Sequence, residues 1–130
     1  MSHFSIAKVK VQVKNPNLLK KTVQEIIQKT NGVQVQEIYD YYGNKQTDFL
    51  IAFKNSDFPR GVGIRVNEKG EIEIKGDFYG IPNSKIEELQ REIVQGYTKN
   101  AIEFALKRMN YNVQVNEQQN KVYITAWTWR

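Results

Sequence analysis

The sequence predicts one α+β domain over residues 1–130, with two helices packed on one face of an antiparallel sheet of about six or seven strands. Several short stretches alternate apolar and polar residues, which is typical of half-buried strands. Two stretches, near 16–30 and 84–109, keep apolar residues at helical spacing. The predicted strands between these helices are consecutive, which favours an α+β class over a doubly wound sheet. The length of 130 residues fits one domain.

The first strand and the first helix are the clearest local patterns. Within residues 4–13, three valines alternate with lysine and glutamine, so one strand face is apolar and the other is charged. The segment Asn15-Pro16-Asn17 then stops the strand and supplies an N-cap. Asn31-Gly32 fits a left-handed helix end near residue 30.

Four strands follow, at 33–39, 49–53, 62–66 and 71–74. The last two form the clearest hairpin, because Asn67-Glu68-Lys69-Gly70 is a turn sequence between two alternating runs. On this hairpin Glu71 and Glu73 lie opposite the isoleucines, so we expect both carboxylates to face solvent.

The second helix is expected to begin at a capping box, because Ser84 precedes Glu87 by three residues. Its apolar stripe extends to Phe104, which we expect in the core. Gly96 interrupts the stripe at a cost of about 1 kcal/mol relative to alanine, which predicts a kink or a close packing contact. Two further strands, around 111–115 and 121–129, complete the chain.

The element order is therefore β-α-β-β-β-β-α-β-β. Its first seven elements resemble the TATA-binding-protein-like architecture, and a ferredoxin-like arrangement is the alternative. This likeness concerns topology and implies no activity.

Positive charge is concentrated at the start of the chain. The net charge is +5, and residues 1–30 hold six lysines and one glutamate, so they account for the whole excess. Such a segment can attract a polyanion, nucleic acid above all. It can also protect a strand edge from aggregation. The candidate polyanion contacts are Lys8, Lys10, Lys14, Lys20 and Lys21.

The composition excludes several kinds of chemistry. The chain has no cysteine and a single histidine, His3, which rules out thiolate sites and multi-histidine metal sites. His3 would act as a general base only if a carboxylate oriented it. Asp77 follows a short predicted strand, and we expect it to form a turn; ligand binding is the alternative. We therefore expect a non-catalytic protein with no cofactor and no metal, and we expect neither a membrane span nor a signal segment.

Aromatic residues mark the last strand. Tyr123, Trp127 and Trp129 share one face, and the aliphatic residues between them share the other. If the aliphatic face meets the core, the aromatic face is an interface or a platform for stacking bases; otherwise it is covered within the chain. The sequence thus favours a protein-interaction or self-associating module, as a homodimer or with another protein. A nucleic-acid-binding protein that uses the lysine-rich segment and the aromatic strand is the alternative.

Several segments carry a family resemblance: the opening Met1-Ser2-His3-Phe4-Ser5, the stretch Asp77-Phe78-Tyr79-Gly80 and the ending Ala126-Trp127-Thr128-Trp129. In these the chain resembles a family of small uncharacterised proteins of cyanobacteria and algal plastid genomes, the hypothetical chloroplast reading frames. The resemblance implies a soluble, cytoplasmic protein and brings no activity with it. It adds interest to His3 and Asp77 as positions to test.

Overall fold

The computed structural model describes residues 4–119 and 121–128, and it confirms the α+β class. Helix α1 spans Pro16–Lys29 and helix α2 spans Asn83–Arg108, close to the predicted ranges. The described strands are β1 (Ser5–Gln12), β2 (Val33–Val35), β3 (Ile38–Tyr39), β4 (Lys45–Gln46), β5 (Ile51–Lys54), β6 (Val62–Val66), β7 (Glu71–Gly76), β8 (Asn112–Gln118) and β9 (Lys121–Trp127).

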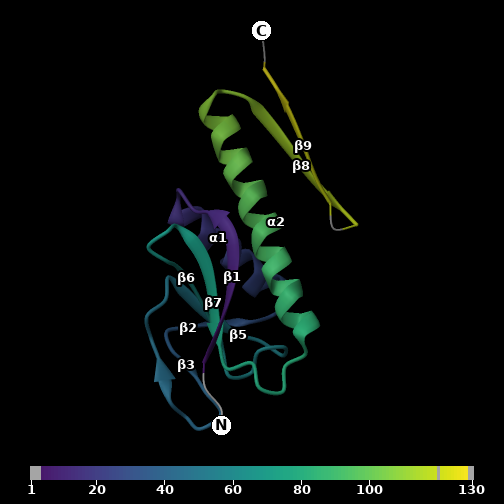
Figure 1. Ribbon diagram of the computed structural model, residues 1–130. Helices are drawn as coiled ribbons and strands as arrows, with labels where there is room; N and C mark the ends of the chain where they lie inside the picture. The colour runs from purple at the N-terminus through teal and green to yellow at the C-terminus, as the bar shows by residue number, and fades with distance from the viewer. Residues whose placement is uncertain (1–3, 120, 129–130) are drawn as a thin grey trace.

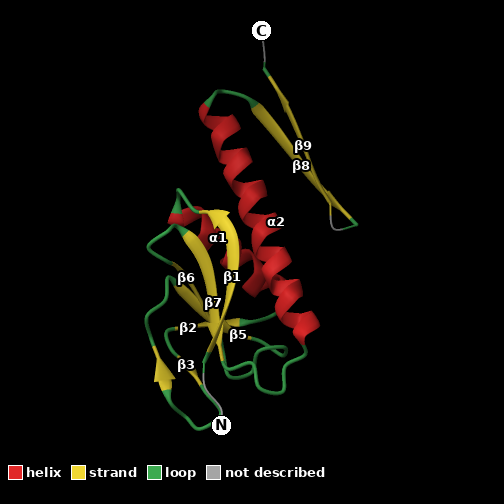
Figure 2. Cartoon of the chain, viewed as in Figure 1, coloured by secondary structure: helices red, strands yellow, loops and turns green. Residues whose placement is uncertain are grey.

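The strands form one main sheet and two small ones (Figures 1 and 2). The main sheet is antiparallel, has the order β1-β7-β6-β5-β2, and is smaller than the predicted six or seven strands. The predicted strand 33–39 is split, because β2 pairs with β5 whereas β3 pairs with β4, a short strand that the sequence pattern did not reveal. The last two strands pair with each other in a separate hairpin.

The hydrophobic core lies between the main sheet and both helices. Alternation along the strands directs one set of apolar residues to the helices. The opposite sheet face carries polar residues such as Lys8, Arg65 and Glu73, together with the Phe49 ring, which covers Gly63. The core combines Leu19, Val23, Ile26 and Ile27 of α1 and Leu89, Ile93 and Tyr97 of α2 with strand residues such as Val9, Phe53, Val62, Ile64, Ile72 and Ile74.

The helix ends agree only partly with the sequence signals. Asn15 caps α1, with its Oδ1 accepting a hydrogen bond from the Asn17 N–H at 3.2 Å. Asn31 has a φ of 54°, the left-handed conformation expected after that helix. The capping box predicted at Ser84 is wrong. Helix α2 begins at Asn83, directly after Pro82, whose ring fixes φ at −59°, and the helix has no side-chain cap.

Helix α2 is longer than the sheet it covers. Figure 1 shows its C-terminal half extending past the main sheet, with the β8–β9 hairpin beside it. Phe104 lies on this half and is exposed, so its predicted place in the core is wrong. Its ring instead lies 5.6 Å from the Arg108 guanidinium. At Gly96, by contrast, the predicted close contact is present, because α1 and α2 meet there.

Candidate functional site

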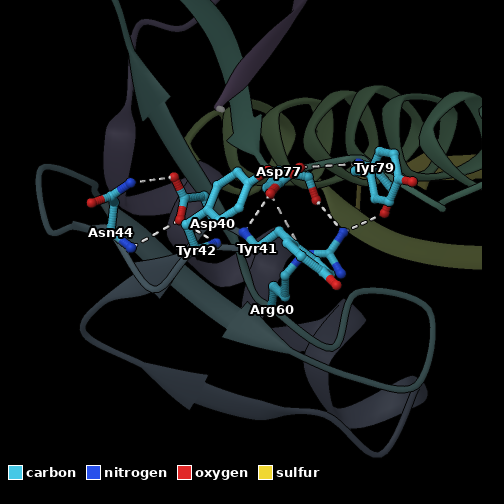
Figure 3. A network of polar contacts seen from close by, with 7 residues as sticks. All are labelled: Asp40, Tyr41, Tyr42, Asn44, Arg60, Asp77 and Tyr79. Carbon is cyan, nitrogen blue, oxygen red and sulfur yellow. Dashed lines mark hydrogen bonds and ion pairs between the residues drawn. The ribbon is translucent and has the colours of Figure 1, made fainter. Parts of the chain in front are cut away.

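Three exposed tyrosines come together on two neighbouring loops (Figure 3). Tyr41 and Tyr42 lie in the loop after β3, separated from the strand by Asp40, and Tyr79 lies in the loop after β7. Their exposed fractions are 61%, 64% and 69%. The ring centroids of Tyr41 and Tyr42 are 5.4 Å apart, and those of Tyr41 and Tyr79 are 5.9 Å apart, both with edge-on geometry. We call these three residues the tyrosine cluster.

The carboxylate of Asp77 connects the two loops that carry the tyrosines. Its side chain is only 2% exposed. Its Oδ2 accepts a hydrogen bond from the Tyr41 N–H at 2.6 Å, and its Oδ1 accepts one from the Tyr79 N–H at 3.1 Å. The second bond forms the Asx turn expected from the sequence. The first spans 36 residues and fixes the position of the β3 loop relative to the loop after β7.

Arg60 reinforces the same junction. Its Nε lies 3.7 Å from the Asp77 carboxylate, and its guanidinium donates hydrogen bonds to the main-chain oxygens of Asp77 and Tyr79. A guanidinium offers several donors in a rigid plane, so one side chain orients both the carboxylate and the neighbouring loop.

Asp40 shapes the loop that carries Tyr41 and Tyr42. Its Oδ1 accepts hydrogen bonds from the N–H groups of Tyr42 and Asn44, and its Oδ2 accepts one from the Asn44 side chain at 2.8 Å. The side-chain bond from Asn44 is the largest influence in lowering the Asp40 pKa, and the two N–H groups lower it further. The charged carboxylate is thus the form that the loop requires.

Together these contacts hold the main chain of each tyrosine while its ring faces solvent. The geometry suits a contact surface, because the loops are ordered before a partner arrives. The sequence pattern singled out Asp77 but missed Tyr41 and Tyr42, since aromatic residues next to a turn carry no periodic signal. The 36-residue link between the loops exists only in three dimensions.

The β8–β9 hairpin is the second aromatic surface. Tyr123 is 51% exposed and Trp127 is 38% exposed, whereas the alternate residues Val122, Ile124 and Ala126 are half-buried. The alternation predicted for the last strand is therefore present over its described part. Trp129 lies outside the described residues.

The lysines of the first segment whose side chains the structure describes do not gather on one surface. Lys8 lies on the main sheet's open face, since its neighbour Val9 points into the core between sheet and helices. Lys20 and Lys21 lie on α1, which covers the other face, and Lys14 lies in the connection before it. The Lys10 side chain and His3 lie outside what the structure describes. The hairpin belongs to a different sheet, beside α2.

The open face also corrects the prediction for Glu73. This residue is 6% exposed, because it lies between its cross-strand neighbours Lys8 and Arg65. Arg65 Nε donates a hydrogen bond to Glu73 Oε1 at 2.8 Å, and Asn67 donates one to Oε2. The bond from Arg65 is the main cause of the lowered Glu73 pKa. Both oxygens of the Glu73 carboxylate thus have hydrogen-bond partners within the sheet, which indicates a structural role for Glu73.

A polar cleft of about 310 Å³ separates α1 and α2 from the tip of the hairpin. Lys99 bridges it, with its Nζ 3.0 Å from Glu117 of the hairpin and 3.9 Å from Glu25 of α1. Three acidic and three basic side chains line the cleft, so neither sign of charge dominates its lining. Within residues 4–119 and 121–128 there is no group of three acidic or histidine side chains placed to hold a metal ion. No helix in that part of the chain has the length and apolar character to cross a membrane.

Comparison with protein-family models, with curated proteins and with solved structures finds no match to this chain. The resemblance to the plastid reading frames and the likeness to the TATA-binding-protein-like topology therefore stay predictions. Any functional assignment depends on the geometry described above.

Proposed function

We propose that this protein is a non-catalytic binding module that docks a partner protein on the tyrosine cluster. The observation that carries the proposal is the exposure of three adjacent tyrosine rings above a buried polar network. Tyrosine is among the residues that contribute most binding energy at protein interfaces. It offers a large, rigid contact area and a hydroxyl group at a small entropic cost.

The surroundings of the cluster indicate what kind of contact it makes. Beside it, Lys45 lies 3.4 Å from Glu37 and Arg60 lies 3.7 Å from Asp77, while the Asp40 carboxylate is held by Asn44 and by main-chain N–H groups, so the charges near the rings have partners within the chain. Binding through the rings therefore depends on apolar and hydrogen-bond contacts rather than on net charge. We expect it to be insensitive to salt, unlike nucleic-acid binding.

The test compares affinity capture from a cell extract by the wild-type chain and by the triple variant Tyr41→Ala, Tyr42→Ala and Tyr79→Ala. The hydrogen bonds that hold the two loops use main-chain groups of these tyrosines, so the variant is expected to fold. Phe104→Ala removes an exposed ring from α2, away from the cluster, and is the control. We expect a partner that wild type and the control retain at high salt and the triple variant loses. Capture of the same proteins by all three chains would contradict the proposal.

The nucleic-acid alternative is tested with the same preparations. Labelled single-stranded RNA and DNA are titrated against the wild-type chain at several salt concentrations. Four lysine–phosphate contacts would give a slope near −3 in log affinity against log salt. We expect no such binding, since the lysines and the hairpin aromatics lie on different parts of the fold.

Self-association, which the aromatic last strand predicts, is also a proposal, and it concerns the hairpin.

A further inference from the structure

The β8–β9 hairpin has two open strand edges. Its seven register pairs join β8 and β9 only to each other, and within the described residues no third strand pairs with either. A two-stranded hairpin is marginally stable in water and gains stability from a further strand or from a packed surface. Helix α2 supplies a packed surface along one face, and the edges stay open.

Both edges of the main sheet are protected. At the β1 edge the Gln90 side chain donates a hydrogen bond to the Lys8 carbonyl oxygen, and the Lys8 ammonium group discourages a second chain. At the opposite edge, β2 has three residues. Strand β9 has seven residues, about 23 Å of chain at 3.3 Å per residue. It carries no charged residue after Lys121. Strand β9 is therefore protected neither by charge along its edge nor by being short.

We propose that β9 is the docking edge for a second copy of this chain. Two β9 strands pair antiparallel across a two-fold axis and make a continuous four-stranded sheet in the order β8-β9-β9-β8. The pairing satisfies the open backbone groups of β9 in both copies. It also joins the exposed Tyr123 and Trp127 of each copy into one aromatic face.

The charge pattern favours an identical partner. Antiparallel pairing places the two Lys121 residues at opposite ends of the joined strands, so no like charges face each other. Strand β9 is preferred over β8 because Val122, Tyr123 and Ile124 suit a paired strand. Strand β8 alternates its valines with asparagine and glutamine and ends in Glu117-Gln118.

The test places one added charge on either strand of the hairpin. Thr125 is exposed near the middle of β9, and Gln114 lies directly opposite it on β8. Thr125→Lys puts two ammonium groups near the two-fold axis, within the Debye length of roughly 10 Å at about 0.1 M salt. Gln114→Lys adds the same charge one strand farther out, so the two new charges are separated by about 10 Å more. Light scattering and sedimentation of the full chain give the dimer dissociation constant.

We expect a wild-type dimer, a dissociation constant at least tenfold higher for Thr125→Lys, and a much smaller change for Gln114→Lys. Because the effect is like-charge repulsion, roughly 1 M salt, with a Debye length near 3 Å, should restore most of the Thr125→Lys dimer. A folding defect would not be restored by salt, and circular dichroism checks it separately. A wild-type monomer at high micromolar concentration would overturn the proposal. Equal weakening by both variants, or no recovery in salt, would also overturn it.

Discussion

Gly96 offers a sharp test of how the two helices pack. A Cβ added at Gly96 of α2 would lie 2.7 Å from Cγ2 of Thr22 on α1, which is shorter than real contacts. Thr22 is not free to turn away. Its Oγ1 donates a hydrogen bond to the Leu18 carbonyl at 2.8 Å and accepts one from the Asn100 side chain at 2.9 Å.

The expected effect of Gly96→Ala on the free energy of unfolding is the difference between a gain in helix propensity and a loss from overpacking. Alanine gains about 1 kcal/mol over glycine inside a helix. Overpacking of a buried contact costs about 1–3 kcal/mol. The free energy of unfolding should therefore fall by about 0–2 kcal/mol. In a Thr22→Ser background the obstructing methyl group is gone while the hydroxyl remains, so the same substitution should raise the free energy of unfolding by about 1 kcal/mol.

Urea denaturation of the four chains of this double-mutant cycle measures the coupling, which should be about 1–3 kcal/mol. Ala105→Gly on the exposed part of α2 is the control, because it measures the propensity of this helix without a packing contact. If Gly96→Ala has the same effect in both backgrounds, the methyl contact does not limit the approach of the helices and the reasoning is wrong.

Two further predictions concern the carboxylates of the buried Asp77 and the half-buried Glu92. Asp77→Ala removes the acceptor of two main-chain N–H groups and the carboxylate that lies beside the Arg60 guanidinium. We therefore expect a loss of about 3–5 kcal/mol in urea denaturation, against less than about 0.5 kcal/mol for the exposed Asp48→Ala. Burial raises the pKa of Glu92, with Glu88 adding to the rise, so the ionised form is disfavoured in the folded chain. The contribution of Glu92 to stability is complete below its ordinary pKa of about 4.3 and is lost as pH rises through the raised folded pKa. Glu92→Gln should therefore increase the melting temperature at pH 7 and leave it unchanged below about pH 4; an equal gain at both values would contradict the assignment.

Local signals predicted the helices well because their causes lie within a few residues. Asn15 caps α1 through its own turn, and Asn31 takes the left-handed conformation where the apolar stripe ends. The start of α2 was misplaced because Pro82 and Ser84 both signal a helix start, and local sequence does not decide between them. Phe104 was misassigned because helical periodicity tells which face is apolar and not where the covering sheet stops.

Long-range pairing accounts for what the sequence left out. Glu73 was assigned to solvent from its own strand, but its burial depends on Lys8 and Arg65 of the two flanking strands. Likewise, the turn role of Asp77 is local and was predicted, whereas its bond to the Tyr41 N–H depends on a loop 36 residues away. The tyrosine cluster therefore depends on contacts that form only when the sheet is assembled.

The two proposed surfaces lie at opposite ends of the molecule, and this separation has a consequence for binding. Figure 1 shows β3, which leads into Tyr41, near the N-terminal end, and the hairpin at the other end. A dimer joined through β9 would leave both tyrosine clusters open and far apart. It would bind a surface that carries repeated sites with an avidity roughly 10²–10⁴ above that of one site, whenever its span matches their spacing. Thr125→Lys should then weaken capture by an immobilised partner and leave its affinity for a single partner molecule in solution unchanged. An equal loss in both formats would mean that residue 125 itself contacts the partner, and the two surfaces would not be independent.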